Sequence, residues 1–100
     1  MIIRVFRTRV HEGKQEEFER FFLNKALPMI KSRQGLISVS VGTPLASTPD
    51  EFVMIMVWKD MDALKGFAGS EWENAVIDPH EGYLVKETFV HHYQAAVLAE

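Results

Sequence analysis

The sequence predicts an α+β domain of the ferredoxin-like, split βαβ type: a four-stranded antiparallel sheet with its helices on one face. The first reason is the order of the segments, whose hydrophobic periodicity alternates as β-α-β-β-α-β. The second reason is size and composition, because 100 residues with 47% hydrophobic and 25% charged side chains suit one globular domain. We expect this domain over residues 1–94 and a C-terminal tail over residues 95–100.

The first half of the chain predicts a strand, a helix and a second strand. Residues 2–10 are rich in β-branched side chains and contain neither Gly nor Pro, which is typical of a strand. From residue 15 onward phenylalanines recur at helical spacing opposite a charged face. Pro28 should kink or break this helix, Gly35 should end it, and residues 36–41 should form the second strand.

The second half carries the elements that complete the order. After a loop they are a strand over 51–58, a helix over 61–68, a short helix from Ser70, and a strand from residue 84 or 85 to 94. The Asp60 carboxylate can cap the first of these helices. Ser70 and Glu73 have the spacing of a capping box, which favours the second.

The strand over 51–58 is apolar on both faces, whereas a half-covered strand would alternate with polar residues. One set of alternate residues is Phe52, Met54, Met56 and Trp58, and the other is Val53, Ile55 and Val57. Because the chain supplies helices for only one sheet face, we expect the other face to pair with a second copy as a two-fold homodimer. The alternative is a monomer whose second face is made polar by the charged residues of the first and fourth strands, which are Arg4, Arg7, Arg9, Lys86 and Glu87.

Composition limits the remaining function classes. The chain has no cysteine, which excludes disulfides, thiolate catalysis and Cys-ligated metal clusters and favours the cytoplasm. The net charge of −3 and the lack of a basic run argue against nucleic acid. The longest apolar run, residues 52–58, is too short to cross a membrane, and no signal peptide is visible.

The end of the third predicted strand resembles a known family. Val57-Trp58-Lys59-Asp60, followed by Ala63-Leu64 and Phe67, is similar to the antibiotic biosynthesis monooxygenase (ABM) domain of the dimeric α+β barrel superfamily. The resemblance covers roughly residues 1–93. It implies a homodimer with a small-ligand pocket in each subunit, between the sheet and the helices.

The resemblance also suggests an activity. It implies a cofactor-independent monooxygenase acting on a small aromatic or acidic carbonyl compound; the alternatives are an isomerase or lyase of the same superfamily, or a non-catalytic ligand-binding or dimerisation module. Haem-degrading members use an Asn, a Trp and an iron-binding His; in register the Trp and His positions fall on Phe67 and Val76, and the Asn position falls near Phe6. Because none of the three matches, we expect no haem degradation unless His80 has taken over the iron.

The candidate site residues follow from these expectations. Cofactor-free oxygenation needs a base to remove a substrate proton, and His80 or His91 could supply it. Arg7 could neutralise an anionic substrate, although pairing with a carboxylate such as Glu87 is the structural alternative. Aromatic side chains that suit a flat apolar ligand are Trp58, Phe67, Trp72 and Tyr83. No metal site is expected, because the neighbouring His91 and His92 point to opposite faces of a strand.

Overall fold

The computed structural model describes residues 1–99 and confirms the predicted order of strands and helices. The strands are β1 (Ile2–Val10), β2 (Leu36–Gly42), β3 (Glu51–Trp58) and β4 (Val85–Gln94). The helical elements are α1 (Gln15–Phe21), the π-helix η1 (Phe22–Ala26), α2 (Leu27–Lys31), α3 (Met61–Ala68) and the short 3₁₀-helix η2 (Gly82–Leu84). The expected tail starts after β4; its last residue, Glu100, lies outside the described residues.

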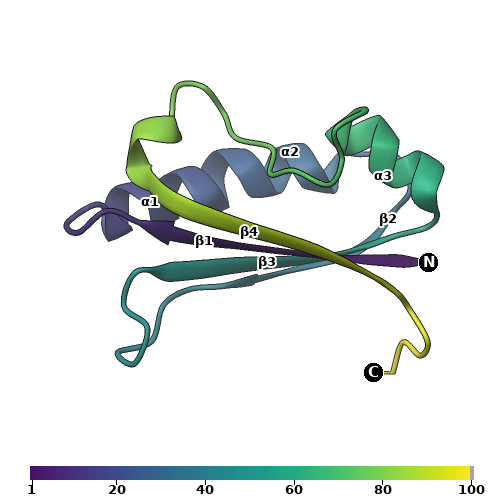
Figure 1. Ribbon diagram of the computed structural model, residues 1–100, viewed down its shortest axis with the longest axis horizontal. Helices are drawn as coiled ribbons and strands as arrows, with labels where there is room; N and C mark the ends of the chain where they lie inside the picture. The colour runs from purple at the N-terminus through teal and green to yellow at the C-terminus, as the bar shows by residue number, and fades with distance from the viewer. Residues whose placement is uncertain (100) are drawn as a thin grey trace.

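The four strands form one antiparallel sheet in the order β2-β3-β1-β4, which is the ferredoxin-like arrangement. Figure 1 shows the helices stacked on one face of this sheet, with no helix of the described residues on the other. The loop between β2 and β3 and the C-terminal tail both extend on the helix-free side (Figure 1).

Strand alternation sorts the side chains into two faces. On β1 and β3 the buried set faces the helices: Arg4, Phe6, Thr8, Val10, Phe52, Met54, Met56 and Trp58. Phe18 of α1 joins this core, with its ring centroid 4.9 Å from that of Phe52. The other set, which includes Val5 and Ile55, lies on the helix-free face. Val5 of β1 is paired with Ile55 on β3 and with His91 on β4.

Of the two outcomes predicted at Pro28, a kink or a break, the break is wrong. The helix runs without interruption from α1 through η1 into α2, and Pro28 is the second residue of α2. Just before it, the Leu27 N–H bonds the Phe22 carbonyl five residues back, which is the wider turn of a π-helix. Because proline lacks the N–H of a regular helical turn and its ring crowds the preceding turn, the π-turn directly before Pro28 is where this continuous helix accommodates it.

The helix predicted from Ser70 is also wrong. Gly69, at φ +82°, ends α3, and residues 69–81 form turns and irregular backbone. The reason is tertiary, because the Arg4 guanidinium donates hydrogen bonds to the carbonyls of Trp72 and Asn74. These carbonyls would otherwise accept bonds from N–H groups later in a helix.

The start of α3 confirms its prediction. The Asp60 carboxylate accepts a hydrogen bond of 2.8 Å from the Ala63 N–H, as the cap requires. All helical elements among residues 1–99 are too short, or too polar, to reach across a lipid bilayer.

Candidate functional site

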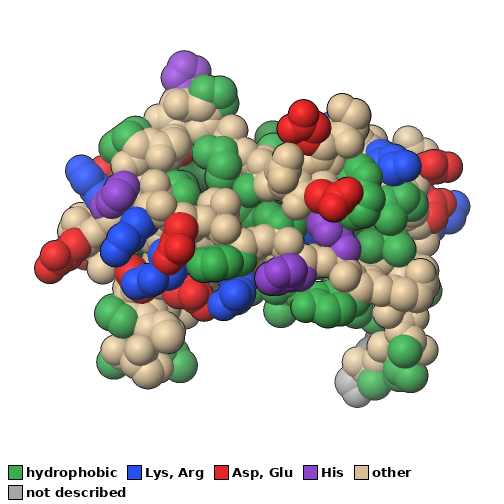
Figure 2. All heavy atoms as spheres, in the orientation of Figure 1, with side chains coloured by type: hydrophobic (Ala, Val, Ile, Leu, Met, Phe, Trp, Pro, Cys, Tyr) green, Lys and Arg blue, Asp and Glu red, His purple; other side chains and the backbone are tan. Residues whose placement is uncertain are grey.

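A cavity of about 330 Å³ lies between the sheet, the helix layer of α1 to α2, and the loop 69–81 that joins α3 to η2. Most of its wall is apolar and aromatic, with contributions from each layer: Phe6, Met54 and Met56 from the sheet, Phe21 and Phe22 from the helices, and Phe67 from α3. Figure 2 shows hydrophobic side chains gathered beneath this loop. Such a wall suits a flat apolar ligand.

Arg4 is the charged side chain that β1 contributes to the cavity wall. It is only 1% exposed, and its Nη1 donates to the Trp72 carbonyl at 2.5 Å and to His92 Nε2 at 2.9 Å. Its Nη2 donates to the Asn74 carbonyl at 3.0 Å. Burial lowers the pKa of the Arg4 guanidinium to about 10, so that this side chain remains a cation at neutral pH.

His92 reaches Arg4 from β4, where the two residues are paired across the sheet. Its ring lies edge-on to the Trp72 ring, with 4.9 Å between centroids. Burial, and then the charge of Arg4, lowers the pKa of His92 below its ordinary value. Because Nε2 accepts from Arg4, the neutral imidazole carries its proton on Nδ1.

Two carboxylates from the loop side complete the charged lining. The Glu81 side chain is 15% exposed and lies 3.6 Å from the ammonium of Lys25, which also lines the cavity. Asp78 accepts the backbone N–H of His80 at 2.8 Å. The cavity therefore has one buried cation in the sheet and two proton acceptors on the covering loop.

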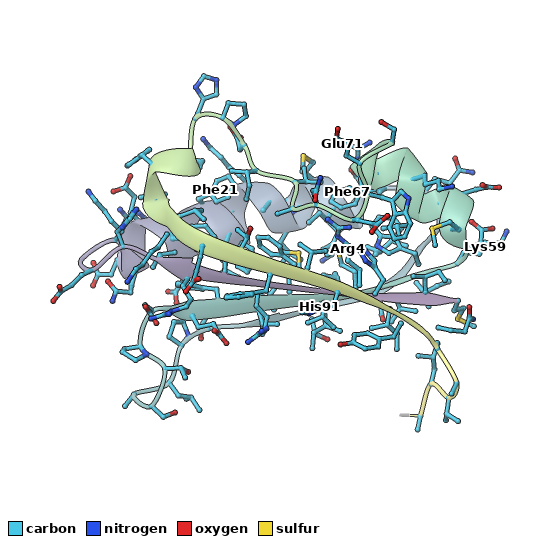
Figure 3. All side chains as sticks on the ribbon, in the orientation of Figure 1. Arg4, Phe21, Lys59, Phe67, Glu71 and His91 are labelled. Atoms are coloured by element: carbon cyan, nitrogen blue, oxygen red, sulfur yellow. The ribbon has the colours of Figure 1, made fainter. Side chains whose placement is uncertain are left out.

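Two of the predicted base and anion-binding residues, Arg7 and His91, lie on the helix-free face. The Arg7 guanidinium lies 3.5 Å from the Glu51 carboxylate and 4.8 Å from the centroid of the Phe89 ring. Figure 3 shows His91 on the side of the sheet opposite Arg4 and Phe67. The third, His80, is exposed on the covering loop, beside Glu81.

The predicted aromatic residues are divided between the wall and its surroundings. Phe67 lines the cavity, and the fully buried Trp58 stacks behind it with 5.1 Å between ring centroids. Trp72 presents its carbonyl to Arg4 and its ring to His92. Tyr83 is 57% exposed, and its hydroxyl donates to the Glu17 carboxylate on α1.

Sequence reasoning missed Arg4 and Glu81 as site residues. The signal for Arg4 is its place in the alternation of β1, where it shares a face with Phe6, a cavity residue. Glu81 sits in an irregular segment that has no periodicity to read. Among residues 1–99 no three His, Asp or Glu side chains gather in a way that could hold a metal ion.

Comparisons with known proteins agree with this fold. A variant of SnoaB, a cofactor-independent oxygenase from Streptomyces nogalater, superposes with a TM-score of 0.71 at 23% identity, covering 97% of this chain and 94% of that one. A protein from Shewanella oneidensis gives a TM-score of 0.76 at 17% identity, over 92% and 87% of the two chains. MhuD, a heme-degrader from Mycobacterium tuberculosis with two hemes bound in its active site, gives 0.73 at 12% identity, over 100% of both.

At these identities the solved structures show a shared fold. A search of curated protein sequences finds no match. The profile of one family, described as antibiotic biosynthesis monooxygenase (ABM), matches residues 1–97. Because that match spans nearly the whole sequence, the chain belongs to the ABM family.

Proposed function

We propose that this protein is a cofactor-independent monooxygenase that acts on a small aromatic or otherwise acidic carbonyl compound. The observation that carries the proposal is the cavity, whose aromatic wall includes the mostly buried carboxylate of Glu81. Family membership supplies the reaction class, and the shape and chemistry of the wall supply the substrate class. The cytoplasm remains the proposed location, on composition alone.

The proposed reaction needs one base and dioxygen. The base removes a proton from a methylene carbon made acidic by neighbouring carbonyl or aromatic groups, and the resulting carbanion transfers electrons to dioxygen. Overall, a CH₂ group and O₂ become a C=O group and H₂O. The carbon loses four electrons and dioxygen gains them, so that one oxygen atom enters the product and the other leaves as water.

We assign the base to Glu81. Its carboxylate lines the cavity, and its ion-pair contact is with the exposed Lys25, at 3.6 Å. His80 is the second candidate, because it follows Asp78 on the same loop and could turn inward. His91 would need a substrate on the helix-free face, away from this wall.

Oxygen uptake tests the assignment with a panel of anthrones and quinols. We expect uptake by the wild-type protein and a loss of about 100-fold or more in kcat for Glu81→Gln. Glu19→Gln, an exposed change on α1, is the matched control and should keep wild-type uptake. His80→Ala and His91→Ala should also keep it, and a large loss in either would move the base to that residue.

A non-catalytic ligand-binding module is the second candidate function. The observation that favours it is that neither histidine predicted as a base lines the cavity. Tight binding of several panel members without oxygen uptake by any of them would establish this reading and reject the monooxygenase.

Haem does not fit this cavity wall. The positions at which haem-degrading relatives carry their functional residues fall on Phe67 and Val76 and near Phe6, and these three residues line the cavity without offering a nitrogen ligand. His80 is exposed at the loop surface. We therefore derive no step through haem, and a haem titration should leave the Soret band unshifted.

We also propose that two copies pair through the helix-free sheet face. Its central residues are apolar, and Ile55 at its middle is 40% exposed in a single chain. Tyr93 on β4 is 55% exposed on the same face. A sheet face of this kind, with no helix of residues 1–99 over it, marks an interaction surface, and an identical face is its simplest complement.

A further inference from the structure

Two hydrogen-bond donors of Arg4, on neighbouring nitrogens, have no partner among residues 1–99. A guanidinium offers five N–H groups, and three of them bond the Trp72 carbonyl, the Asn74 carbonyl and His92 Nε2. The Arg4 Nε–H is buried and has no partner in the described part of the chain. Nη2 uses one of its two N–H groups, so Nε and Nη2, which are neighbouring nitrogens of the guanidinium, each keep one N–H group without a partner among residues 1–99.

The charge of Arg4 is also uncompensated. Within residues 1–99 no carboxylate oxygen lies within 4.0 Å of its guanidinium, whereas Arg7 pairs with Glu51 and Arg9 pairs with Asp50 and Glu87. His92 is a neutral acceptor and brings no negative charge. A buried cation without a counter-ion is costly to the fold, which gives an anionic group a reason to bind there.

The surroundings of Arg4 restrict which anion fits. The side chain is 1% exposed and lies under Phe67, with its Cζ atom 5.7 Å from the centroid of that ring. Figure 3 shows Arg4 and Phe67 close together on the helix side of the sheet. An anion carried on an apolar body suits these surroundings better than a strongly hydrated inorganic anion does, because the cavity wall around Arg4 is mostly apolar.

We propose that Arg4 forms a carboxylate-binding subsite in the cavity, and that the natural ligand is an aromatic carboxylic acid. A carboxylate has two oxygens in one plane and can accept two parallel hydrogen bonds from neighbouring guanidinium nitrogens, while a single phenolate or enolate oxygen could accept both only through bent hydrogen bonds. This inference deepens the proposed function, since it names the substrate class of the same cavity. The inference goes beyond the proposed function because it requires the substrate to carry a carboxylic acid group in addition to the carbon that reacts.

Equilibrium binding to the wild-type protein tests the subsite without any substitution. The probes are 2-naphthoate and 2-naphthamide, which have the same ring system and differ in charge. Titrations followed by calorimetry at pH 7.5 under nitrogen should show naphthoate binding about 10-fold or more tightly. Equal affinities for the two probes would overturn the proposal.

Two variants locate the preference. Arg4→Lys keeps the positive charge but removes the planar fork, so the ratio of the two affinities should fall toward one. Arg7→Lys should keep the wild-type ratio, because Arg7 lies on the other sheet face. A ratio that survives in Arg4→Lys and is lost in Arg7→Lys would transfer the site to Arg7 and reject our assignment.

The design separates this inference from the proposed activity. Because oxygen is excluded, the affinity ratio does not depend on turnover. A carboxylate preference without oxygen uptake on the panel would reject the monooxygenase and retain the subsite. Oxygen uptake on neutral anthrones with equal naphthoate and naphthamide affinities would retain the monooxygenase and reject the subsite.

Discussion

The contact between Gly35 and α3 gives a prediction about the part of the fold that positions the cavity wall. Gly35 lies just before β2 at φ +86°, and its carbonyl accepts the Lys59 N–H at 2.8 Å. A Cβ atom at this position would overlap the Cβ of Ala63 on α3. Since α3 also carries Phe67 into the cavity, a shift of this helix would change the wall.

Gly35→Ala should be strongly destabilising, for two separable reasons. A non-glycine residue in the left-handed region costs about 1–2 kcal/mol. Forcing a methyl group into a packed contact costs about 1–3 kcal/mol more. The sum of about 2–5 kcal/mol is a large part of the stability of a small domain and should lower Tm by about 8 °C or more.

Gly13→Ala is the matched control for the backbone part. Gly13 has φ +82°, but a methyl group added there would meet no atom of residues 1–99 within 4 Å, so only the cost of about 1–2 kcal/mol applies. The double variant Gly35→Ala/Ala63→Gly removes the overlapping methyl group and should recover the packing part. Urea unfolding followed by circular dichroism measures the wild type and these variants.

The reasoning fails if Gly35→Ala is no more destabilising than Gly13→Ala. It also fails if the two changes at Gly35 and Ala63 are additive within about 0.5 kcal/mol, because residues in direct contact should couple by more than that.

Two further predictions concern a charged group and a surface. Because the pKa of His92 is lowered in the folded state, by burial and then by Arg4, the unfolded chain binds more protons below about pH 6.5. Glu73 opposes this shift and His91 adds to it. The free energy of unfolding should therefore fall as pH decreases from 7.5 to 5.5. The variant His92→Gln should flatten this dependence of Tm on pH, whereas His11→Gln, in an exposed turn, should keep it. Equal slopes of Tm against pH in all three proteins would contradict the role of His92. Ile55→Lys should convert a dimer into the 11.5 kDa monomer in sedimentation, whereas Leu23→Lys on the helix layer should not, and a wild-type monomer at micromolar concentration would reject the dimer.

The faces of the strands could be predicted because alternation is a property of the extended backbone. Arg4 shares a face with Phe6, and His91 lies on the other face from His92, as the pattern requires. The strand at 51–58 showed apolar residues on both sides, and its helix-side residues are buried. Alternation does not show which face carries the cavity. Arg4 and Arg7 were therefore equally good candidates for an anion-binding residue until the positions of the helices were known.

The loop over the cavity was beyond local reasoning. Ser70 and Glu73 have the spacing of a helix start, yet the segment takes its shape from hydrogen bonds to Arg4, which lies 68 and 70 positions before the two carbonyls that it binds. Such a contact leaves no periodic trace in the sequence. The same holds for Glu81, whose side chain is covered by the packing of the loop against the helix layer and not by a regular element.

The double use of Arg4 decides how its variants must be interpreted. Its guanidinium holds the carbonyls of Trp72 and Asn74, on the loop that also carries Glu81, and in our proposal its remaining N–H groups bind the carboxylate of the ligand. Loosening the loop would weaken the binding of naphthoate and naphthamide alike, and it would lower kcat by displacing Glu81, the proposed base. Loss of the planar guanidinium lowers only the affinity for naphthoate, which carries the carboxylate. The ratio of the two affinities therefore reports recognition of the carboxylate by Arg4, while the absolute affinities and kcat report the position of the loop. An Arg4 variant that lowers both affinities equally, at an unchanged ratio, would show that Arg4 anchors the loop and does not bind the acid.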